Sequence, residues 1–449
     1  MTLDESPYQG YLYAYPHKTA YRRLEPRRPL REVWREERQD ALFGYVHLPF
    51  CEMRCGFCNL FTRANPPAEQ VTAYLAQLRR QAVAVRDSLA GDAAFAQLAI
   101  GGGTPTYLTA AELESLFEIV ALAFGPARLP MSVETSPATA TADRLAVLAE
   151  HGTTRVSMGV QSFLDAEAHA AGRPQRLAEV LTALETIRAA GIPVLNVDLI
   201  YGIDGQTTRT WQHSLDEALR WRPEELYLYP LYVRPLTGLG RRAHGRDGWD
   251  RQRQELYAQA VEVLTAAGYV QQSMRQFRRA GAPVVGGPSL DGPSLGGPSL
   301  DGPDYCCQDD GMVGLGCGAR SYTSSLHYSF DYAVGVGEVR AVIDDYLGRP
   351  ADDFRFAEIG FELDEVEQRR RWLLKSLLRR EGVDAAAYRT RFGTAHADDF
   401  PQLTVLADRG WMTGDRLRLT ADGLAQSDAI GPWLVSGSVR EAMGAYVPR

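Results

Sequence analysis

Three cysteines within eight residues are the clearest chemical feature of this sequence. Cys51, Cys55 and Cys58 lie in FCEMRCGFCNLF, residues 50–61, directly after YVHLP, which is typical of a short buried strand. Thiolate is a soft ligand that suits zinc and iron-sulfur clusters, and this spacing lets one short loop surround a single cofactor. His47 could complete a four-ligand zinc site. A 4Fe-4S cluster held by three cysteines would instead leave one iron open for a substrate or cofactor, and the spacing alone leaves both sites open.

The composition indicates an ordinary globular protein that works in a reducing compartment. With 449 residues, 45% hydrophobic and 23% charged, the chain has enough length for more than one domain and no apolar run of membrane-spanning length. The start, MTLDESPYQG, lacks the features of a secretory signal, so we expect a cytoplasmic protein without a membrane span. Six cysteines then favour metal or cofactor binding over disulfides. A net charge of −8 argues against general nucleic-acid binding.

Short apolar segments alternate with helical patterns through the first two thirds of the chain, and this positions the cysteines after the first strand. We expect strands of about five residues, each followed by a helix of ten or more, in about six repeats over residues 43–268. Such repeats form parallel sheets, either a partial TIM-type barrel or a doubly wound sheet. Glycine and polar residues gather where the strands end, the face on which both architectures build their sites.

The remaining segments predict a multi-part chain. We assign residues 1–42 to an N-terminal arm, 43–280 to the core, 281–304 to a flexible insertion that repeats GPSL, 305–350 to the end of the core, and 351–449 to a C-terminal domain. The arm contains KTAYRRLEPRRPLR, where six basic residues meet one Glu. This stretch either lies against the core as a solvated arm or contacts an anionic substrate or partner.

From Phe361 onward, apolar residues recur with helical spacing, and a predicted helix, a turn and a tight hairpin follow. This arrangement predicts a winged-helix-like C-terminal module. The second part is FPQLTVLADRGWMTGDRLRLTADGL, residues 400–424. The Asp and Glu content of the whole module, from Phe361 onward, favours a packing or lid role over nucleic-acid binding.

The cysteine loop and its place after the first strand resemble the radical S-adenosylmethionine (SAM) superfamily. The blocks YVHLPFCEMRCGFC, GGGTPTYL, VETSP, SMGVQSF, NVDLIYGIDGQT and GLGCGARS stand in the order found in oxygen-independent coproporphyrinogen III oxidase and its HemN-like relatives, over residues 43 to about 322. The resemblance implies a partial (β/α)6 TIM-type radical SAM barrel with a HemN-type C-terminal domain. It also implies that SAM chelates the open iron of a 4Fe-4S cluster and is cleaved to methionine and a 5'-deoxyadenosyl radical.

The resemblance also implies, block by block, which residues bind the cofactors. Cys51, Cys55 and Cys58 would hold the cluster, and two SAM molecules would share the active site. The implied contacts of the first SAM are Tyr45, Phe57, Gly102, Gly103, Thr104 and Glu134, and those of the second are Gln161, Arg173, Asp198 and Tyr232. Glycine lets a backbone approach a ligand closely. Structural alternatives are a left-handed turn for the glycines, a helix cap for Thr104 and a surface ion pair for Arg173.

Three departures separate the chain from the best-known relatives. Coproporphyrinogen oxidase has a further Cys where this chain has Leu60, and a Met-Asp-His-Phe segment where this chain has Arg275 and Gln276 in SMRQFRR. The heme chaperone (HemW-like) branch has a His-Asn-x-x-Tyr-Trp motif, and the corresponding stretch here, YCCQDDGMVGLG, contains no histidine. These departures weigh against coproporphyrinogen decarboxylation and against heme transfer.

We therefore predict a radical SAM enzyme related to class C methyltransferases and cyclopropanases. Its radical would take hydrogen from the methyl group of a second SAM or directly from a small-molecule substrate. The expected electron donor is a reduced flavodoxin or ferredoxin-type protein, with no nucleic acid or membrane partner. The alternatives are a coproporphyrinogen III oxidase, a non-catalytic carrier of heme or SAM, and a zinc-stabilised scaffold.

Overall fold

The structure is a computed structural model that describes residues 2–126, 128–241, 248–283, 311–413 and 417–447. Most of the predicted GPSL insertion, from residue 284 onward, lies outside the described residues.

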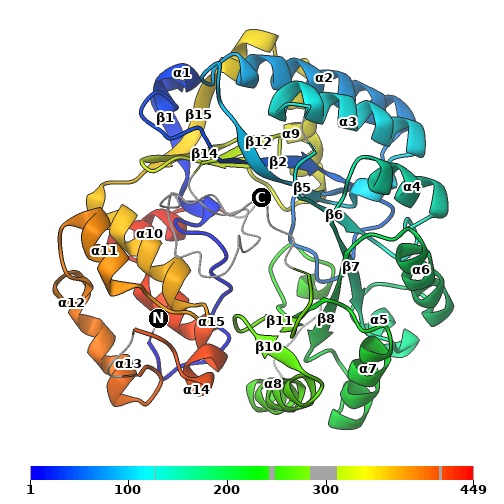
Figure 1. Cartoon of the computed structure of the whole chain (residues 1–449), viewed down its shortest axis with the longest axis vertical. Helices are drawn as coiled ribbons and strands as arrows, with labels where there is room; N and C mark the ends of the chain where they lie inside the picture. The colour runs from blue at the N-terminus through cyan, green and yellow to red at the C-terminus, as the bar shows by residue number, and fades with distance from the viewer. Residues whose placement is uncertain (1, 127, 242–247, 284–310, 414–416, 448–449) are drawn as a thin grey trace.

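Six parallel strands, each followed by a helix, form the centre of the molecule (Figure 1). The strands are β2 (Leu42–Leu48), β5 (Phe95–Gly102), β6 (Met131–Thr135), β7 (Arg155–Gln161), β8 (Val194–Tyr201) and β9 (Glu225–Pro230). The helices are α2 (Ala68–Arg86), α3 (Ala110–Phe124), α4 (Ala142–Glu150), α6 (Leu177–Ala189), α7 (Thr208–Arg220) and α8 (Trp249–Ala266), with a short α5 (Asp165–Ala170) before α6. The strands are buried because the helices cover their outer face. The predicted alternation is confirmed.

The order of these strands distinguishes the two architectures that the sequence left open. Neighbours in the sheet run β2-β5-β6-β7-β8-β9, the order of the chain, and each pair is parallel. A doubly wound sheet reverses direction at a switch point. The single direction of winding therefore identifies a partial barrel.

Further strands extend both edges into a 13-stranded sheet. Beyond β9 lie the antiparallel strands β11 (Gln276–Arg279) and β10 (Tyr269–Gln271). Beyond β2 lie β12 (Met312–Leu315), β13 (Arg320–Tyr322), β14 (Leu326–Ser329), β15 (Phe356–Glu362) and β1 (Arg22–Pro29). Thus β1, expected in the arm, and β15, expected in the C-terminal domain, join the core sheet. The arginine- and proline-rich sequence of β1 lacks the apolar alternation by which strands are predicted.

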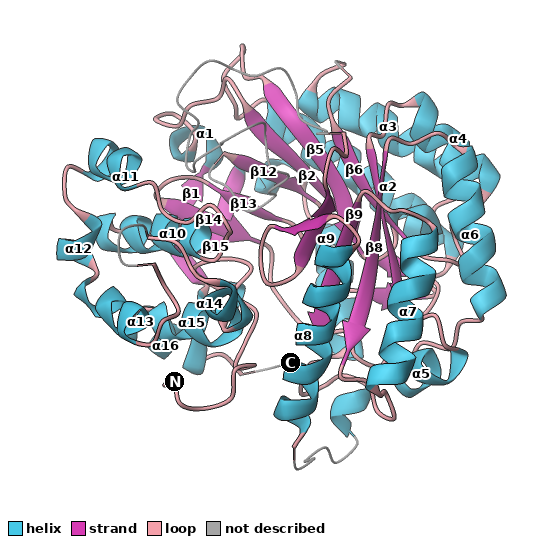
Figure 2. Ribbon diagram, turned by 60° about the horizontal axis from the view of Figure 1, so that its bottom comes forward, coloured by secondary structure: helices cyan, strands magenta, loops and turns pink. Residues whose placement is uncertain are grey.

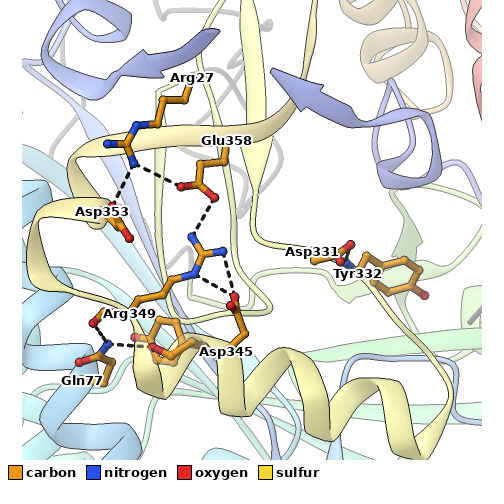
Figure 3. A network of polar contacts seen from close by, with 9 residues as sticks. Arg27, Gln77, Asp331, Tyr332, Asp345, Arg349, Asp353 and Glu358 are labelled. Carbon is orange, nitrogen blue, oxygen red and sulfur yellow. Dashed lines mark hydrogen bonds and ion pairs between the residues drawn. The ribbon is translucent and has the colours of Figure 1, made fainter. Parts of the chain in front are cut away.

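Ion pairs hold the basic arm against the core (Figure 3). Arg27 lies 2.9 Å from Asp353 and 3.6 Å from Glu358, and Glu358 in turn lies 3.1 Å from Arg349. Arg349 is also 2.9 Å from Asp345 of helix α9 (Val336–Gly348). These charges are therefore neutralised within the chain, which supports the packing interpretation for this part of the arm.

The C-terminal helices form a second core beside the barrel (Figure 2). They are α10 (Glu365–Leu377), α11 (Ala385–Phe392), α12 (His396–Asp399), α13 (Thr404–Asp408), α14 (Ala421–Ala425), α15 (Ser427–Leu434) and α16 (Gly437–Gly444). The turn of the predicted hairpin, residues 414–416, lies outside the described residues, and the described residues on either side form a bridge between Met412 and Leu419. Leu3, Tyr15 and Ala20 pack into this same core, so the chain's first residues join the C-terminal domain to the barrel. Within the described residues, no helix is both long and apolar enough to cross a membrane.

Candidate functional site

Solvent-accessible side chains on otherwise buried strands mark the interior of the barrel. Glu134 is exposed although β6 lies in the middle of the sheet, and Tyr45, Asp198 and Tyr229 are partly exposed on β2, β8 and β9. Side chains of one strand alternate between the two faces, and the helices cover the outer face. These residues therefore face accessible space inside the barrel, where a ligand would be enclosed.

The cysteine loop is fixed against two other loops at the barrel edge. It leaves β3 (Phe50–Cys51) and returns through β4 (Arg63–Ala64). At its centre, the N–H of Gly56 donates to the carbonyl of Gly172 at 3.0 Å, and the carbonyl of Gly56 accepts from the N–H of Leu239 at 2.8 Å. A Cβ at residue 56 would lie 2.9 Å from the carbonyl oxygen of Ala171, so only glycine permits this close approach.

The three thiols are half-buried, and polar groups from other segments reach two of them. Thr104 Oγ1 lies 3.6 Å from Cys51 Sγ, and Arg173 Nη1 lies 3.9 Å from Cys55 Sγ. Burial raises the pKa of Cys51 and Cys55, and the Arg173 guanidinium opposes the shift at Cys55. Burial thus disfavours the thiolate form, and a bound metal cation would offset that cost.

The residues present fit a cluster better than a single ion. In the described part of the chain, no three His, Cys, Asp or Glu side chains converge as the ligands of one ion would. A cluster does not require that convergence, because each thiolate binds a different iron. Three half-buried, free thiols on one loop with a donor beside Cys55 match that requirement.

His47 is committed elsewhere and does not complete a zinc site. Its Nε2 lies 3.0 Å from the carbonyl oxygen of Phe61, and its Nδ1 lies 3.3 Å from the Tyr45 hydroxyl. Burial lowers the pKa of His47 to about 4. Both ring nitrogens therefore have partners within the protein, and the zinc alternative loses its proposed fourth ligand.

The glycines at the end of β5 have a packing requirement of their own. The N–H groups of Gly103 and Thr104 donate to the carbonyls of Leu48 and Phe50, both at 2.7 Å. A Cβ at Gly103 would lie 2.4 Å from the Phe50 carbonyl oxygen, and Gly102 has a φ of +111°. These residues thus bring the β5 end against the strand that carries Cys51. Their predicted contact with SAM stays a prediction.

Glu134 lies beside this glycine edge inside the barrel. Its Oε2 accepts the N–H of Gly102 at 3.0 Å. The carboxylate is accessible to solvent yet enclosed by the barrel, and this partial desolvation raises its pKa to about 7, against the effect of the Gly102 N–H. Asp198 adds to the rise. The site therefore holds an acid that changes charge near neutral pH.

Replacing Glu134 by glutamine is expected to remove a pH-dependent loss of stability. The folded protein holds the Glu134 proton more tightly than the unfolded chain does, so the wild type loses stability as pH rises from about 4.5 to about 7. The melting temperature of ligand-free Glu134→Gln should rise relative to wild type across this window. Glu338→Gln, at an exposed helical position, is the control. A difference between Glu134→Gln and wild type that stays constant with pH would contradict the assignment.

Gln161, Arg173 and Asp198, three of the four predicted contacts of the second SAM, lie close together, and their contact with SAM stays a prediction. A Cβ at Gly159 would lie 2.7 Å from Nε2 of Gln161 and 3.3 Å from Nη1 of Arg173, and Gly159 is the partner of Asp198 in the adjacent strand. Gln161 has a φ of 69°, in the left-handed region that non-glycine residues rarely adopt, at an irregularity in β7. Such strain is typical of functional sites.

Asp198 interacts electrostatically with the charged and polar side chains around it. Asn196 Nδ2 donates to its Oδ1 at 2.7 Å, and burial raises its pKa to about 6, while Asn196, Arg155 and Arg173 oppose the shift. Because Arg173 also reaches Cys55, one guanidinium lies between the cysteine loop and Asp198. The structural alternative of a surface ion pair for Arg173 is wrong, since this side chain is buried.

Two predicted contacts lie in other surroundings. Phe57 packs against an apolar cluster that includes Ile200 and Leu231. The Tyr232 hydroxyl donates to Asp428 Oδ2 at 2.5 Å, on helix α15. Their roles in SAM binding stay predictions.

The sequence analysis did not single out Glu52. Its Oε1 accepts the Ser136 hydroxyl at 2.7 Å, and its buried Oε2 has no partner among the described residues. The signal was present, because Glu52 lies in the cysteine block and Ser136 in VETSP.

Comparison with known proteins agrees with this geometry. Residues 45–218 match the Radical SAM superfamily. The chain is 27% identical over 381 residues to the heme chaperone HemW of Bacillus subtilis, covering 82% of this chain and 91% of that protein. It is 27% identical over 392 residues to the oxygen-independent coproporphyrinogen III oxidase of Pseudomonas aeruginosa, covering 86% and 80%. The solved structure of coproporphyrinogen III oxidase (HemN) from Escherichia coli shares the fold, with a TM-score of 0.74, 22% identity and 93% coverage of both chains.

The fold, the cysteine loop and these similarities lead to one assignment. Membership in the superfamily implies a 4Fe-4S cluster and SAM. The chain is a HemN-like member of the radical SAM superfamily.

Proposed function

We propose that this protein is an enzyme that cleaves SAM at a 4Fe-4S cluster and holds a second SAM for carbon-carbon bond chemistry on a small molecule. When bound and reduced, the cluster supplies the electron that cleaves SAM into methionine and a 5'-deoxyadenosyl radical. Cys51, Cys55 and Cys58 hold the cluster in this proposal. The predicted SAM contacts named in the sequence analysis bind and orient the two SAM molecules and exclude water from the enclosed space.

One observation carries the proposal, namely that Arg173 joins the cysteine loop to a buried polar group of the barrel. Arg173 contacts Cys55 and lies with Gln161 over Gly159, next to Asp198. SAM has an ammonium, a carboxylate and two ribose hydroxyls. The guanidinium is a donor for the carboxylate, and Asp198 and Glu134 are acceptors for the ammonium and hydroxyl groups. The barrel therefore offers donors and acceptors of the kinds that two SAM molecules require.

The proposed reaction type depends on SMRQFRR, which stands where coproporphyrinogen oxidase has its Met-Asp-His-Phe segment. Arg275 stands where the resemblance implies an Asp, and it is buried in an ion pair with Asp428. It is therefore committed to a contact between the barrel and the C-terminal domain. This favours methyl transfer or cyclopropanation over the coproporphyrinogen oxidation of the Pseudomonas relative. Heme transfer, the role in the name of the Bacillus relative, is a further alternative that the missing histidine disfavours.

We further propose a flavodoxin or ferredoxin-type electron donor and a cytoplasmic location for the protein.

Labelled SAM tests the two-SAM proposal. The reconstituted, reduced enzyme is incubated with SAM carrying a trideuterated methyl group and with candidate acceptors. If the radical takes hydrogen from the second SAM's methyl group, the 5'-deoxyadenosine gains one deuterium, which mass spectrometry detects. Unlabelled 5'-deoxyadenosine together with a product that lost hydrogen from the substrate itself would contradict methyl-group abstraction.

Replacing Asp198 by alanine is expected to lower the number of bound SAM molecules from two to about one. The second site loses a buried acceptor, whereas the cluster loop keeps its ligands. Equilibrium dialysis of the unreduced, reconstituted enzyme with radiolabelled SAM measures the stoichiometry, and an unchanged iron content confirms that the cluster is intact. A wild type that binds one SAM, or a variant that still binds two, would refute the role of Asp198.

A further inference from the structure

The N-terminal segment enters the interior of the barrel. The ring of Tyr11 lies 6.4 Å from that of Tyr229, which is on the interior face of β9, and the guanidinium of Arg275 lies 3.7 Å from the Tyr11 ring. The ring of Tyr8 lies 6.3 Å from that of Tyr201, which packs against helices α7 and α8 on the outer face of β8. Through Tyr11, which is exposed, the segment before β1 therefore borders the space in which the cofactors are expected.

Two cationic side chains lie close to the cysteine loop, Lys18 on this segment and Arg320 on strand β13. Lys18 Nζ lies 3.6 Å from the centre of the Tyr332 ring, and the Tyr332 hydroxyl donates to the carbonyl of Asn59 at 3.1 Å (Tyr332 is labelled in Figure 3). Arg320, on β13, places its guanidinium 5.0 Å from the Tyr13 ring. Lys18 and Arg320 are thus gathered on one side of the loop, around phenol rings.

Neither cation has a carboxylate partner in an ion pair within the described part of the chain. Both instead hydrogen-bond the Tyr13 hydroxyl and, against the effect of burial, lower the pKa of Tyr13. The other charges that act on Lys18 and Arg320 come from phenols, from the Cys58 thiol and, at Lys18, from Arg320. The Nη1 atom of Arg320 is buried without a hydrogen-bond partner among the described residues. Burial, with Arg320 nearby, lowers the pKa of Lys18 to about 8. Buried cations that have only phenol partners are costly, and a bound anion would compensate their charge.

Most of the expected SAM contacts lie on the other side of β2 from Arg320, and of these contacts Tyr45, on β2 itself, is near enough to interact with Arg320. Gly102, Glu134 and Asp198 lie on β5, β6 and β8, on one side of β2, whereas β13 lies on the other side. Both residues fall outside residues 45–218, the part that matches the superfamily, although Arg320 lies in GLGCGARS, one of the blocks that resemble HemN-like relatives. Lys18 lies outside all of those blocks and is therefore suited to recognise what differs between members, which is the substrate.

We propose that Lys18 and Arg320 form a subsite for an oxyanion of the substrate, a carboxylate or a phosphate, beside the cysteine loop. The planar guanidinium of Arg320 suits two-pronged binding of such groups, and Lys18 adds a compact charge. This inference rests on the proposed function, since it names the substrate class of the same site.

Thermal unfolding of the reconstituted, SAM-bound and unreduced enzyme tests the subsite. Acetate and inorganic phosphate are compared with chloride at constant ionic strength. At least one oxyanion should raise the wild-type melting temperature by about 2 °C or more, and the more effective one names the class. Arg320→Gln and Lys18→Gln should lose most of this rise, whereas Arg320→Lys should keep part of it. Arg23→Gln, at an exposed arginine of the same arm, should keep all of it.

Two results would overturn the proposal. One is an equal response to oxyanions, or none, in both the wild type and Arg320→Gln. The other is a SAM affinity that falls about tenfold in Arg320→Gln in equilibrium dialysis, because the bound anion would then be the SAM carboxylate. Failure of the proposed function has a different readout, since it appears as intact SAM in the reduced wild type, and the melting experiments contain no reductant.

Discussion

Cys55→Ala is expected to abolish both the cluster and the cleavage of SAM. Cys55 is the central ligand of the loop, and its thiol is the one that Arg173 contacts. Two remaining thiols cannot hold the cluster as three do, so iron content and the visible absorption of the reconstituted protein should fall to background. Liquid chromatography should detect no 5'-deoxyadenosine after reduction in the presence of SAM.

Cys317→Ala is the matched control for this loss. Cys317 is buried on the opposite side of β2 from the barrel's central strands, where its thiol lies 3.8 Å from the Tyr74 hydroxyl. This variant should keep iron, colour and SAM cleavage. Cleavage that persists in Cys55→Ala would show that another set of cysteines holds the cluster.

Asp428→Ala is expected to lower the free energy of unfolding by about 3–5 kcal/mol. The Asp428 carboxylate on α15 pairs with Arg275 and accepts the Tyr232 hydroxyl, and the side chains of Asp428 and Arg275 are 1% and 5% exposed. Removing the carboxylate leaves the Arg275 charge buried without its partner, whose presence raises the pKa of Arg275. Urea unfolding of the variant and the wild type measures the difference.

A second variant separates this charge effect from a general loss of packing. In Asp428→Leu/Arg275→Met both charges are absent, so much of the lost stability should return. Asp422→Ala, at an exposed acid on neighbouring α14, should change the stability little. If the double variant were less stable than Asp428→Ala, the ion pair would not be the source of the effect.

The repeating part of the fold was predictable because its signal is local. Each of the six strands is a short apolar run, and a segment with helical periodicity follows it. The periodicity therefore gives the strand and helix positions within a few residues. The sequence did not reveal β1, because RRLEPRRP has no apolar face and pairs with β15 through its backbone. Its place in the sheet depends on a partner more than 300 residues away in the chain.

The candidate site was predictable where a motif defines a position and not where distant segments meet. The cysteine block and NVDLIYG located the loop and Asp198, and the structure then brought Arg173 to both. No local pattern shows that Arg275 finds Asp428, 153 residues further on. Likewise the basic arm contains Arg27, which forms an ion pair, and Lys18, which lies over the Tyr332 ring. Only tertiary contacts distinguish the two.

The formation of 5'-deoxyadenosine by the wild-type protein tests the central claim most directly. The full chain is reconstituted anaerobically with iron and sulfide, reduced with dithionite and given SAM. We predict a brown protein that releases 5'-deoxyadenosine and methionine in equal amounts. A colourless protein that binds zinc, or a brown protein that leaves SAM intact under these conditions, would contradict the account.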